Sequence, residues 1–433
     1  MVMSDTTIFA RASGAGRAAI AIIRISGRLC GPILDQLGGD RPPPRRAVLR
    51  GLHAPAADGC GELLDRALVL WFPSPRSYTG EDCAELHLHA GPAVVEAVSA
   101  ALVALGARPA EPGEFTRRAF ANGRLDLLEA EGIADLIEAE TQAQRRQALR
   151  QADGALSALY NDWAARLRHL LAHQEALIDF PDEDLPPEVE TTLVHDLARL
   201  LDEMRTHLAQ GEPAQRIRSG LFIAVIGRPN VGKSSLVNRL AGHEAAIVSE
   251  WAGTTRDAIE VRLVLRGIPV TLVDTAGLRD ALDPLEAEGV RRARRHADHA
   301  DLVLDVATDV SAVGRQGAGV LRVWNKVDLA PAPVGWLGVS ARTGEGMETL
   351  EAMLADAVAG LTETGAGPPL TRARHRAGIE EAASHLAAAG SLDLAELRGE
   401  ALRLAMQALG RLTGTIGVED LLDSVFGQFC IGK

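Results

Sequence analysis

The chain has 433 residues, of which 47% are hydrophobic and 24% are charged, and its formal net charge is -13 at pH 7. This length is too great for one ordinary core and predicts a globular protein of two to four domains. The acidic balance argues against a dedicated nucleic-acid binder, so any RNA contact must come from local Lys and Arg clusters. The four cysteines form no CxxC pair, which argues against a zinc site or a disulfide framework.

The N-terminal residues MVMSDTTIFA lack the basic segment and apolar core of a signal peptide. No run of 18 or more apolar residues occurs, so no membrane span is predicted. The default expectation is a cytoplasmic protein.

Residues 1–120 have the pattern of a mixed α/β domain. Strand-like runs at 19–25, 66–72 and 84–89 precede the helix-forming segment GPAVVEAVSAALVALGA. From 121 to 218 the apolar residues recur with helical spacing, and an acidic, proline-bearing loop at 179–188 divides the region. We therefore expect the first part of a helical domain here.

Residues 219–360 alternate strand, loop and helix, which is typical of a doubly wound parallel sheet. The expected strands lie at 221–226, 261–265, 270–274, 301–306, 320–324 and 336–340. After a linker at 362–369, helical spacing returns from 371 to about 412, and the chain ends in FCIGK. This order predicts a nucleotide-binding domain inserted in a discontinuous helical domain, whose second part is 361–433.

The segment GRPNVGKS (227–234) follows an apolar strand and precedes a helix, the context that makes a P-loop credible. Its glycines let backbone amides turn toward phosphate oxygens, and the helix presents its positive N-terminal end. Lys233 supplies a cation to the outer phosphates, and the Ser234 hydroxyl can bind magnesium. A glycine-rich turn with a chance lysine is the alternative.

Three further motifs follow at strand ends, in the order typical of a GTPase. Asp274 begins DTAG, where a carboxylate reaches magnesium through water and a glycine amide senses the γ-phosphate. Asn325–Asp328 reads NKVD, whose Asp accepts two hydrogens from guanine and rejects adenine. The segment Ser340-Ala341-Arg342 is similar to the last guanine-contact loop. The predicted GTP contacts are Asn230, Val231, Gly232, Lys233, Ser234, Ser235, Ser249, Glu250, Trp251, Ala252, Gly253, Thr254, Thr255, Asp274, Thr275, Ala276, Gly277, Asn325, Lys326, Val327, Asp328, Ser340, Ala341 and Arg342.

The segment GTTRD (253–257) fits a mobile switch whose Thr255 completes the magnesium shell; a solvated loop is the alternative. The residue after DTAG is Leu278, where Ras-like enzymes carry a Gln that orients the attacking water. An apolar side chain cannot do this, so another group must. The segments 306–324 and 329–335 are short, which makes crossover helices there doubtful.

The chain resembles the MnmE (TrmE) family along its whole length, in the segments TIFARAS, YTGED, IDFPDED, GRPNVGKSSLVN, AAIVSEWAGTTRD, DTAGLR and FCIGK. The resemblance implies a potassium-activated GTPase, with the cation beside the phosphates when two GTPase domains meet. It assigns the side-chain potassium ligand to Asn230, with further oxygens from Ser249, Thr254 and the backbone of Trp251, all suited to a hard cation. It assigns the water-orienting role to Glu286, for which a solvated helix charge is the alternative.

The resemblance also implies that the N-terminal domain binds a tetrahydrofolate derivative and forms a homodimer. The folate contacts would be Arg24, Glu81, Arg124 and Lys433. A carboxylate can accept the pterin donors, and Arg suits the glutamate tail. For Arg24 a structural ion pair is the alternative. Cys430 is a possible nucleophile or a small buried hydrophobe.

The implied reaction adds an aminomethyl or carboxymethylaminomethyl group to carbon 5 of the wobble uridine of tRNA, using a folate one-carbon unit. FAD chemistry would belong to a partner subunit, MnmG/GidA, in a heterotetramer or larger complex. The alternatives are a GTPase switch in ribosome assembly and a folate enzyme with a degenerate GTPase domain. The clusters RRARRH (291–296) and RARHR (372–376) could contact RNA or be solvated helix faces. His87 with His89, and His169 with His173, have metal-compatible spacing, but no third ligand is indicated.

Overall fold

The computed structural model describes residues 6–14, 16, 18–56, 61–179, 187–242, 260–274, 300–309, 319–363, 365, 367–392, 394–416, 419–427, 429 and 431–432. Its contacts divide the chain into two compact units, which are described separately. The first comprises Met1–Ala134 with Leu409–Lys433, and the second comprises Asp135–Ala408. Within the described residues, no helix combines the length and apolar character needed to cross a bilayer.

The first unit is built on a six-stranded sheet in the order β3-β4-β5-β2-β1-β6. Only β1 and β6 pair in parallel; the other pairs are antiparallel. The strands are β1 (Ile8–Arg11), β2 (Ile20–Ser26), β3 (Val48–His53), β4 (Leu63–Phe72), β5 (Cys83–His89) and β6 (Arg108–Pro109). The three predicted strands are confirmed as β2, β4 and β5. The sequence missed the others because β1 and β6 are short and β3 carries a glycine and an arginine at its centre.

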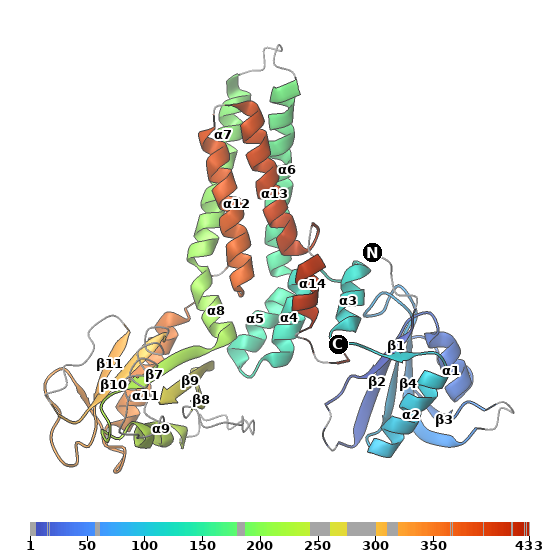
Figure 1. The fold of residues 1–433 in the computed structure, drawn as a ribbon, viewed down its shortest axis with the longest axis horizontal. Coiled ribbons are helices and arrows are strands. Elements are labelled where there is room, and N and C mark those ends of the chain that lie inside the picture. Colours follow the sequence, from blue (N-terminus) through green and yellow to red (C-terminus); the bar gives the residue numbers. More distant parts are fainter. Residues whose placement is uncertain are drawn as a thin grey trace, which may run out of the picture. The chain divides into compact units, whose positions relative to one another are not determined.

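Two helices cover one face of this sheet, α1 (Cys30–Gly38) and α2 (Pro92–Ala104) (Figure 1). The predicted helix at α2 is confirmed, and it begins with a proline, whose missing N–H costs nothing in a first turn. Alternate strand residues such as Ile23, Leu86 and Leu88 point into a core shared with both helices. The opposite face therefore carries the intervening residues, including Arg24 and His87.

The C-terminal segment packs into the same unit. Helices α3 (Glu114–Ala121) and α14 (Glu419–Phe426) are joined by an ion pair in which Arg117 Nη1 lies 3.0 Å from Asp423 Oδ1. An apolar cluster formed by Leu127, Phe426 and Phe429, among others, lies beneath them. Residues far apart in the chain thus complete one core. Helix α4 (Leu127–Glu138) follows α3.

The second unit contains a six-stranded sheet in the order β12-β11-β10-β7-β9-β8. All its pairs are parallel except β8–β9, which confirms the doubly wound arrangement. The strands are β7 (Leu221–Ile226), β8 (Glu260–Leu265), β9 (Ile268–Asp274), β10 (Leu302–Ala307), β11 (Val320–Trp324) and β12 (Leu337–Gly338). Helices α9 (Lys233–Ala241) and α11 (Met347–Leu361) pack on its core.

Strand β12 is shorter than the predicted 336–340, because Val339 and Ser340 already turn into a loop that Ser340 joins to Asp328. No helix lies between Asp328 and β12, as the short spacing predicted. The middle of the other short segment, 310–318, lies outside the described residues.

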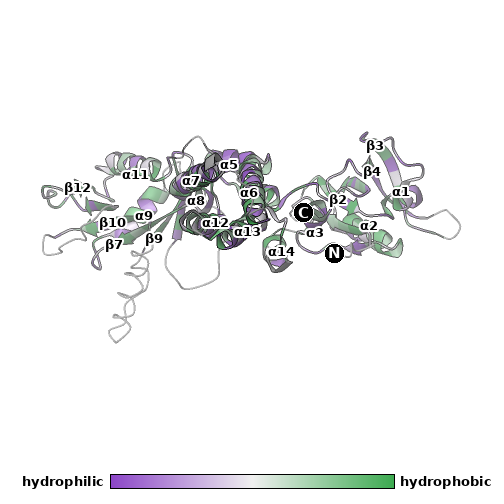
Figure 2. Ribbon diagram, turned by 90° about the horizontal axis from the view of Figure 1, so that it is seen from above, coloured by the Kyte–Doolittle hydropathy of each residue, from purple (hydrophilic) through white to green (hydrophobic). Residues whose placement is uncertain are grey.

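Outside the sheet region, the second unit contains α5 (Gln142–Ala152), α6 (Ala155–Asp179), α7 (Pro187–Ala209), α8 (Gly211–Ser219), α12 (Ala373–Ser391) and α13 (Ala395–Thr413) up to Ala408. Figures 1 and 2 show α6, α7, α12 and α13 grouped side by side. Gln174 Nε2 donates to the carbonyl oxygen of Ala395 at 3.0 Å, and Arg376 Nη2 donates to that of Leu208 at 3.2 Å. The expectation that the two helical parts pack together is confirmed. The domain boundaries proposed from the sequence remain predictions.

A buried aromatic group lies within these helices. The Tyr160 hydroxyl is 3.3 Å from Nε2 of His207, and the Trp163 ring centroid is 5.5 Å from that imidazole. Burial and, as the smaller cause, the charge of His375 together lower the pKa of His207 to about 4. The neutral imidazole can therefore accept the Tyr160 proton.

Because the pKa of His207 is lower in the folded chain than in the unfolded one, the unfolded chain binds the proton first as the pH falls. The free energy of unfolding should therefore decrease between about pH 6.5 and pH 4, by about 3 kcal/mol from this group. Chemical denaturation at several pH values measures this. His207→Gln should flatten that part of the profile, whereas the exposed control His195→Gln should leave it unchanged. Identical profiles for both variants would contradict the assignment.

Candidate functional site

The loop between β7 and α9 has a backbone that only particular residues allow. Gly227 and Gly232 have φ of 148° and 93°, and Asn230 has φ of 64°. A Cβ on Gly227 would lie 2.2 Å from the carbonyl oxygen of Val306, and one on Gly232 would lie 2.4 Å from Nδ2 of Asn325. Glycine at both positions is therefore required by close approach as well as by φ. Left-handed residues in a turn of this kind let backbone N–H groups face an anion.

Lys233 begins helix α9 and is 4% exposed. Its Nζ donates to the carbonyl oxygens of Gly227 at 2.8 Å and Arg228 at 2.9 Å, so the ammonium group is held across the loop. Burial lowers the pKa of Lys233, and the charge of Asp274 opposes this. The loop thus holds a desolvated cation beside the N-terminus of a helix, both of which favour a phosphate group.

The Ser234 hydroxyl donates to Oδ2 of Asp274 at 2.5 Å. Asp274 is fully buried at the end of β9, so its carboxylate is fixed by the sheet. A hydroxyl and a carboxylate are oxygen ligands of the kind that Mg²⁺ takes in phosphate sites. The donor set therefore fits a magnesium ion bound together with a nucleotide.

Asn325, after β11, connects the loops of this site. Its Nδ2 donates to the carbonyl oxygen of Val231 at 2.8 Å, and its Oδ1 accepts from the N–H of Ala341 at 3.2 Å. The next residue, Lys326, has φ of 65° and donates from Nζ to the carbonyl oxygen of Asn230 at 2.8 Å. The structure thus brings the P-loop, the NKVD segment and the Ser340–Arg342 segment together, as the sequence predicted.

Asp328 presents a carboxylate with a defined orientation. Ser340 Oγ donates to its Oδ1 at 2.6 Å, and Arg342 Nη2 donates to its Oδ2 at 2.5 Å. The hydrogen bond from Ser340, followed by that from Arg342, lowers the pKa of Asp328, so the group is an acceptor at neutral pH. Two anchored carboxylate oxygens match the paired N–H donors of guanine. The sequence did not predict the ion pair with Arg342.

Several predicted site residues lie outside the described part of the chain. They are Ser249, Glu250, Trp251, Ala252, Gly253, Thr254, Thr255, Thr275, Ala276, Gly277, Glu286, Cys430 and Lys433. The first basic cluster, 291–296, and Leu278 also lie there.

In the first unit, the predicted Glu81 accepts from Ser26 Oγ at 2.7 Å and from Arg118 Nη1 at 3.0 Å. Arg118 also donates to Glu114 at 2.9 Å, and its side chain is 10% exposed. The carboxylate of Glu81 is therefore fixed from two sides. Arg118 was not predicted as a site residue, although its spacing of four residues from Glu114 in a helix signals the ion pair between those two.

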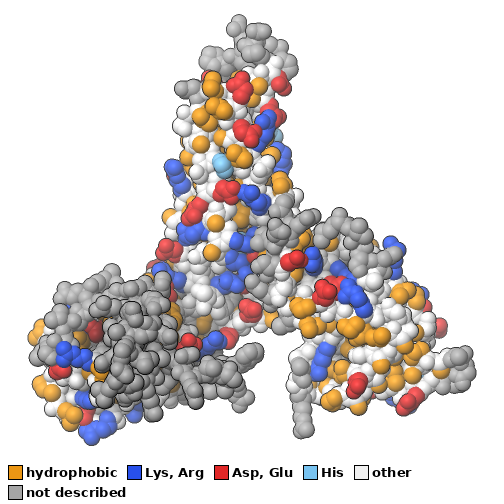
Figure 3. All heavy atoms as spheres, in the orientation of Figure 1, with side chains coloured by type: hydrophobic (Ala, Val, Ile, Leu, Met, Phe, Trp, Pro, Cys, Tyr) orange, Lys and Arg blue, Asp and Glu red, His pale blue; other side chains and the backbone are white. Residues whose placement is uncertain are grey.

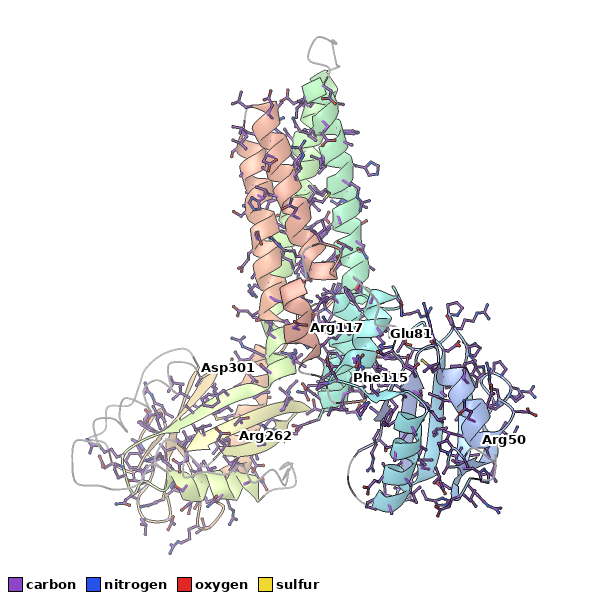
Figure 4. The ribbon with its side chains drawn as sticks, turned by 45° about the vertical axis from the view of Figure 1, so that its right-hand side comes forward. Arg50, Glu81, Phe115, Arg117, Arg262 and Asp301 are labelled. Carbon is purple, nitrogen blue, oxygen red and sulfur yellow. The ribbon has the colours of Figure 1, made fainter. Side chains whose placement is uncertain are left out.

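Arg24 forms an ion pair in which Nη2 lies 2.9 Å from Glu85 Oε1, the alternative that the sequence left open. Its guanidinium also lies 5.3 Å from the ring centroid of Tyr78 and 6.0 Å from that of Phe115. Figure 4 labels Glu81 and Phe115 in this part of the unit. A charged group over two aromatic rings beside a fixed carboxylate is suited to a planar polar ligand.

Arg124 lies against the same loop, since its Cγ is 3.2 Å from where a Cβ on Gly80 would stand. Asn122 Nδ2 donates to the carbonyl oxygen of Thr79 at 2.7 Å and holds the loop in place. At the C-terminus, a Cβ on Gly432 would stand 2.4 Å from the carbonyl oxygen of Arg11. The described predicted residues thus gather around the loop 78–82, and the C-terminal segment lies beside β1.

His87 and His89 each lie beside a carboxylate. His87 Nε2 is 3.4 Å from Glu85, and His89 Nδ1 is 2.7 Å from Asp65. Among the residues that the structure describes, no group of three His, Cys, Asp or Glu side chains is placed to hold a metal ion. In the second basic cluster, His375 is fully buried and Arg372 is paired with Asp135, so these two are not solvated charges.

Two family models match most of the chain. The model described as "GTP-binding protein TrmE N-terminus" matches residues 7–124, and "MnmE helical domain" matches residues 127–430. Three bacterial proteins named "tRNA modification GTPase MnmE" match over the full length of both chains. The one from Gluconacetobacter diazotrophicus is 65% identical over 435 residues, that from Granulibacter bethesdensis 56% over 444, and that from Rhodospirillum rubrum 52% over 455.

Solved structures match a smaller part of the chain. Era from Aquifex aeolicus bound to GDP and AlF4⁻ is 22% identical and covers 38% of this chain and 66% of its own, with a TM-score of 0.26. The G domain of the T. maritima FeoB iron transporter is also 22% identical and covers 33% of this chain and 99% of its own, with a TM-score of 0.24.

Replacing the Asp328 carboxylate with an amide should reverse one hydrogen bond to the base. We expect Asp328→Asn to weaken GTP binding by at least about 100-fold, because a donor of guanine would face an NH₂ group. Xanthosine triphosphate has a carbonyl in place of the guanine amino group, so its binding should improve. Equilibrium binding of fluorescent nucleotides measures both. The control Glu345→Gln alters an exposed carboxylate nearby and should change neither; an unchanged GTP preference in Asp328→Asn would refute the assignment.

Proposed function

The chain belongs to the MnmE family of tRNA modification GTPases. On that premise we propose that it is a potassium-activated GTPase that modifies tRNA with a one-carbon unit from folate. In this proposal GTP hydrolysis drives addition of an aminomethyl or carboxymethylaminomethyl group to carbon 5 of the wobble uridine. The observation that carries the GTPase part is the set of linked loops around Lys233, Asp274 and Asp328.

Each described residue of the nucleotide site then has a role. Lys233 would bind the outer phosphate oxygens. Its ammonium group would then give up its hydrogen bonds to the carbonyl oxygens of Gly227 and Arg228. Ser234 and Asp274 would hold a magnesium ion with the nucleotide, and Thr255 would supply a further oxygen ligand. A bound magnesium ion neutralises charge that develops on the phosphate oxygens. Asp328 selects guanine, and Asn325 maintains the distance between base and phosphate sites.

Potassium would bind beside the phosphates through Asn230, Ser249, Trp251 and Thr254. These are oxygen donors, which suit a hard cation. The described member, Asn230, has a left-handed backbone that asparagine tolerates, and Lys326 holds its carbonyl oxygen. Its position is therefore fixed before a cation arrives. When bound, the cation supplies charge that an arginine finger supplies in other GTPases. Glu286 would orient the attacking water, since Leu278 cannot.

The folate site would use Arg24, Glu81, Arg124 and Lys433. Support comes from the fixed Glu81 carboxylate and from Arg24, which lies over Tyr78 and Phe115. Glu81 would accept pterin N–H donors, while the arginines would bind the glutamate tail. Cys430 is proposed as a possible nucleophile. The position of Gly432 beside Arg11 supports a C-terminal segment within the first unit.

We further propose a homodimer that acts with a FAD-binding partner of the MnmG/GidA type and with tRNA. Figure 3 shows apolar side chains gathered on the visible face of the first unit. On the open face of the sheet, Leu49 stands opposite Leu68, and the two are 63% and 43% exposed. Paired exposed leucines on a sheet face support association through it.

The alternative, a GTPase that acts only as a switch in ribosome assembly, shares the nucleotide motifs. It would not need the N-terminal or helical regions, and both of these match family models for MnmE and TrmE. A folate enzyme with a degenerate GTPase domain is disfavoured, because Lys233, Ser234, Asp274 and Asp328 are present and linked.

Potassium dependence can be tested in matched KCl and NaCl. We expect potassium to stimulate GTP hydrolysis by the wild type by about tenfold or more, a range typical of charge stabilisation at a developing oxyanion. Asn230→Ala should hydrolyse GTP equally slowly in both salts. The matched control Asn238→Ala changes an exposed asparagine on α9 and should behave like the wild type. Equal wild-type rates in the two salts would sink the potassium mechanism and favour the switch.

The folate site can be tested separately. We expect Glu81→Gln to weaken binding of reduced tetrahydrofolate by about tenfold, since a charge-assisted hydrogen bond becomes a neutral one. Isothermal titration calorimetry measures the affinity, and GTP hydrolysis should be unchanged. Glu62→Gln, an exposed carboxylate in the same unit, is the control. If Glu81→Gln binds folate as the wild type does, Glu81 is not a folate contact, and a lower unfolding temperature in that variant would assign it a structural role through Ser26 and Arg118.

A further inference from the structure

One buried carboxylate in the second unit holds two arginines. Asp135 Oδ1 accepts from Arg218 Nε at 2.8 Å and from Arg372 Nη2 at 2.6 Å. The side chain of Asp135 is 8% exposed and that of Arg372 is 14% exposed, so this contact is shielded from water. Such charge-assisted hydrogen bonds are stronger and more directional than those at an exposed surface.

The two arginines stand where the chain passes into and out of the GTPase sheet. Arg218 lies in the last turn of α8, just before β7, and Arg372 is the N-cap of α12, just after the connector 362–370 that follows α11. Asp135 lies in α4 and is the first residue of the second unit, next to the helices that begin with α5. The two segments that connect the GTPase sheet to the helices are therefore both bound by the carboxylate of Asp135.

Helix α8 is also tied to the GTPase sheet through a neighbouring arginine. Arg216 Nε donates to Asp301 Oδ1 at 3.0 Å, and Asp301 Oδ2 accepts from the N–H of Phe222 at 3.0 Å. Figure 4 labels Asp301 at this sheet. Gln144 Nε2 donates to the carbonyl oxygen of Arg218 at 3.0 Å, which adds a second tie to the helices. The last turn of one helix thus contacts the GTPase sheet through Arg216 and α4 and α5 through Arg218.

Without Asp135 the two connecting segments would lose their shared ion-pair partner. The connector TETGAGPP contains two glycines and two prolines, and its glycines allow many backbone conformations. Removing the carboxylate would leave two guanidinium groups close together and partly buried, where they repel. We then expect the GTPase sheet to take several orientations on the helices, while the sheet and the helices each stay folded.

We infer that Asp135 is a positioning residue. Its ion pairs with Arg218 and Arg372 make the helical domain rotate together with the GTPase domain, as one rigid body. Without Asp135, bending of the two connecting segments beside Arg218 and Arg372 takes up the same movement, and the helical domain does not follow. The consequence for tRNA rests on the proposed function, whereas the mechanical part does not. Hydrolysis itself needs neither arginine, because the loops around Lys233 and Asp328 are held by their own contacts.

The test uses Asp135→Asn in the full-length chain, with Glu175→Gln as the matched control. Glu175 pairs with Arg403 at 3.2 Å between α6 and α13, so its loss removes an ion pair that does not reach the GTPase sheet. Non-cysteine spin labels at exposed Glu348 on α11 and His195 on α7 report the distance between the two parts. Labelled chains are diluted with unlabelled ones, so that each dimer carries one labelled copy.

The wild type and Glu175→Gln should each give one narrow distance distribution, and Asp135→Asn a broad one. In KCl, GTP hydrolysis by Asp135→Asn should stay within about twofold of the wild type. Its tRNA modification with the FAD partner should fall about tenfold, a usual size for coupling between sites. Arg372→Gln retains the Asp135–Arg218 pair and should give an intermediate breadth, which tests the inference if Asp135→Asn does not fold.

A narrow distribution in Asp135→Asn, or a loss of GTP hydrolysis equal to the loss of modification, would overturn the inference. A broad distribution in Asp135→Asn, found with a wild type that modifies no tRNA, would support the positioning role and refute the proposed function. The two failures are therefore distinguishable.

Discussion

The nucleotide site depends on the side-chain amide of Asn325. It is 2% exposed, and its two ends bind the backbone of the P-loop and of the loop after β12. Its NH₂ nitrogen lies 2.4 Å from where a Cβ on residue 232 would stand, so the asparagine requires a glycine at that position. An apolar replacement would leave a buried carbonyl and a buried N–H without partners. The separation between the base-reading carboxylate and the phosphate loop is therefore set by one amide.

The electrostatics of the two candidate sites differ. In the nucleotide site, Lys233 is buried among neutral carbonyls, and its pKa is lowered, so the ammonium gains most when a phosphate arrives. In the first unit the charges are already paired, Arg24 with Glu85 and Glu81 with Arg118. A ligand there must exchange existing partners, which favours one with several groups placed at once.

Much of the fold could be predicted because the periodicity of apolar residues and the motifs at strand ends can be read from short stretches of sequence. The strands β7, β9 and β10 and the P-loop after β7 followed from them, as did helix α2. The missed features depend on contacts between distant residues: β1 is only four residues long, and the pairs of Arg118 with Glu81 and Arg342 with Asp328 have no sequence pattern that fixes them. The potassium and folate assignments came from family resemblance, since composition alone favours an ion pair for Arg24.

The packing of α14 on α3 has a consequence for synthesis of the chain on the ribosome. The first unit needs residues of α14 and Phe429 to cover Leu127, yet these emerge only after the whole GTPase sheet has been made. The apolar surface that they cover must stay exposed during that interval, while the second unit can already form its cores. The N-terminal unit is therefore the last to be completed, and it is the one that a chaperone or a pause in translation would protect.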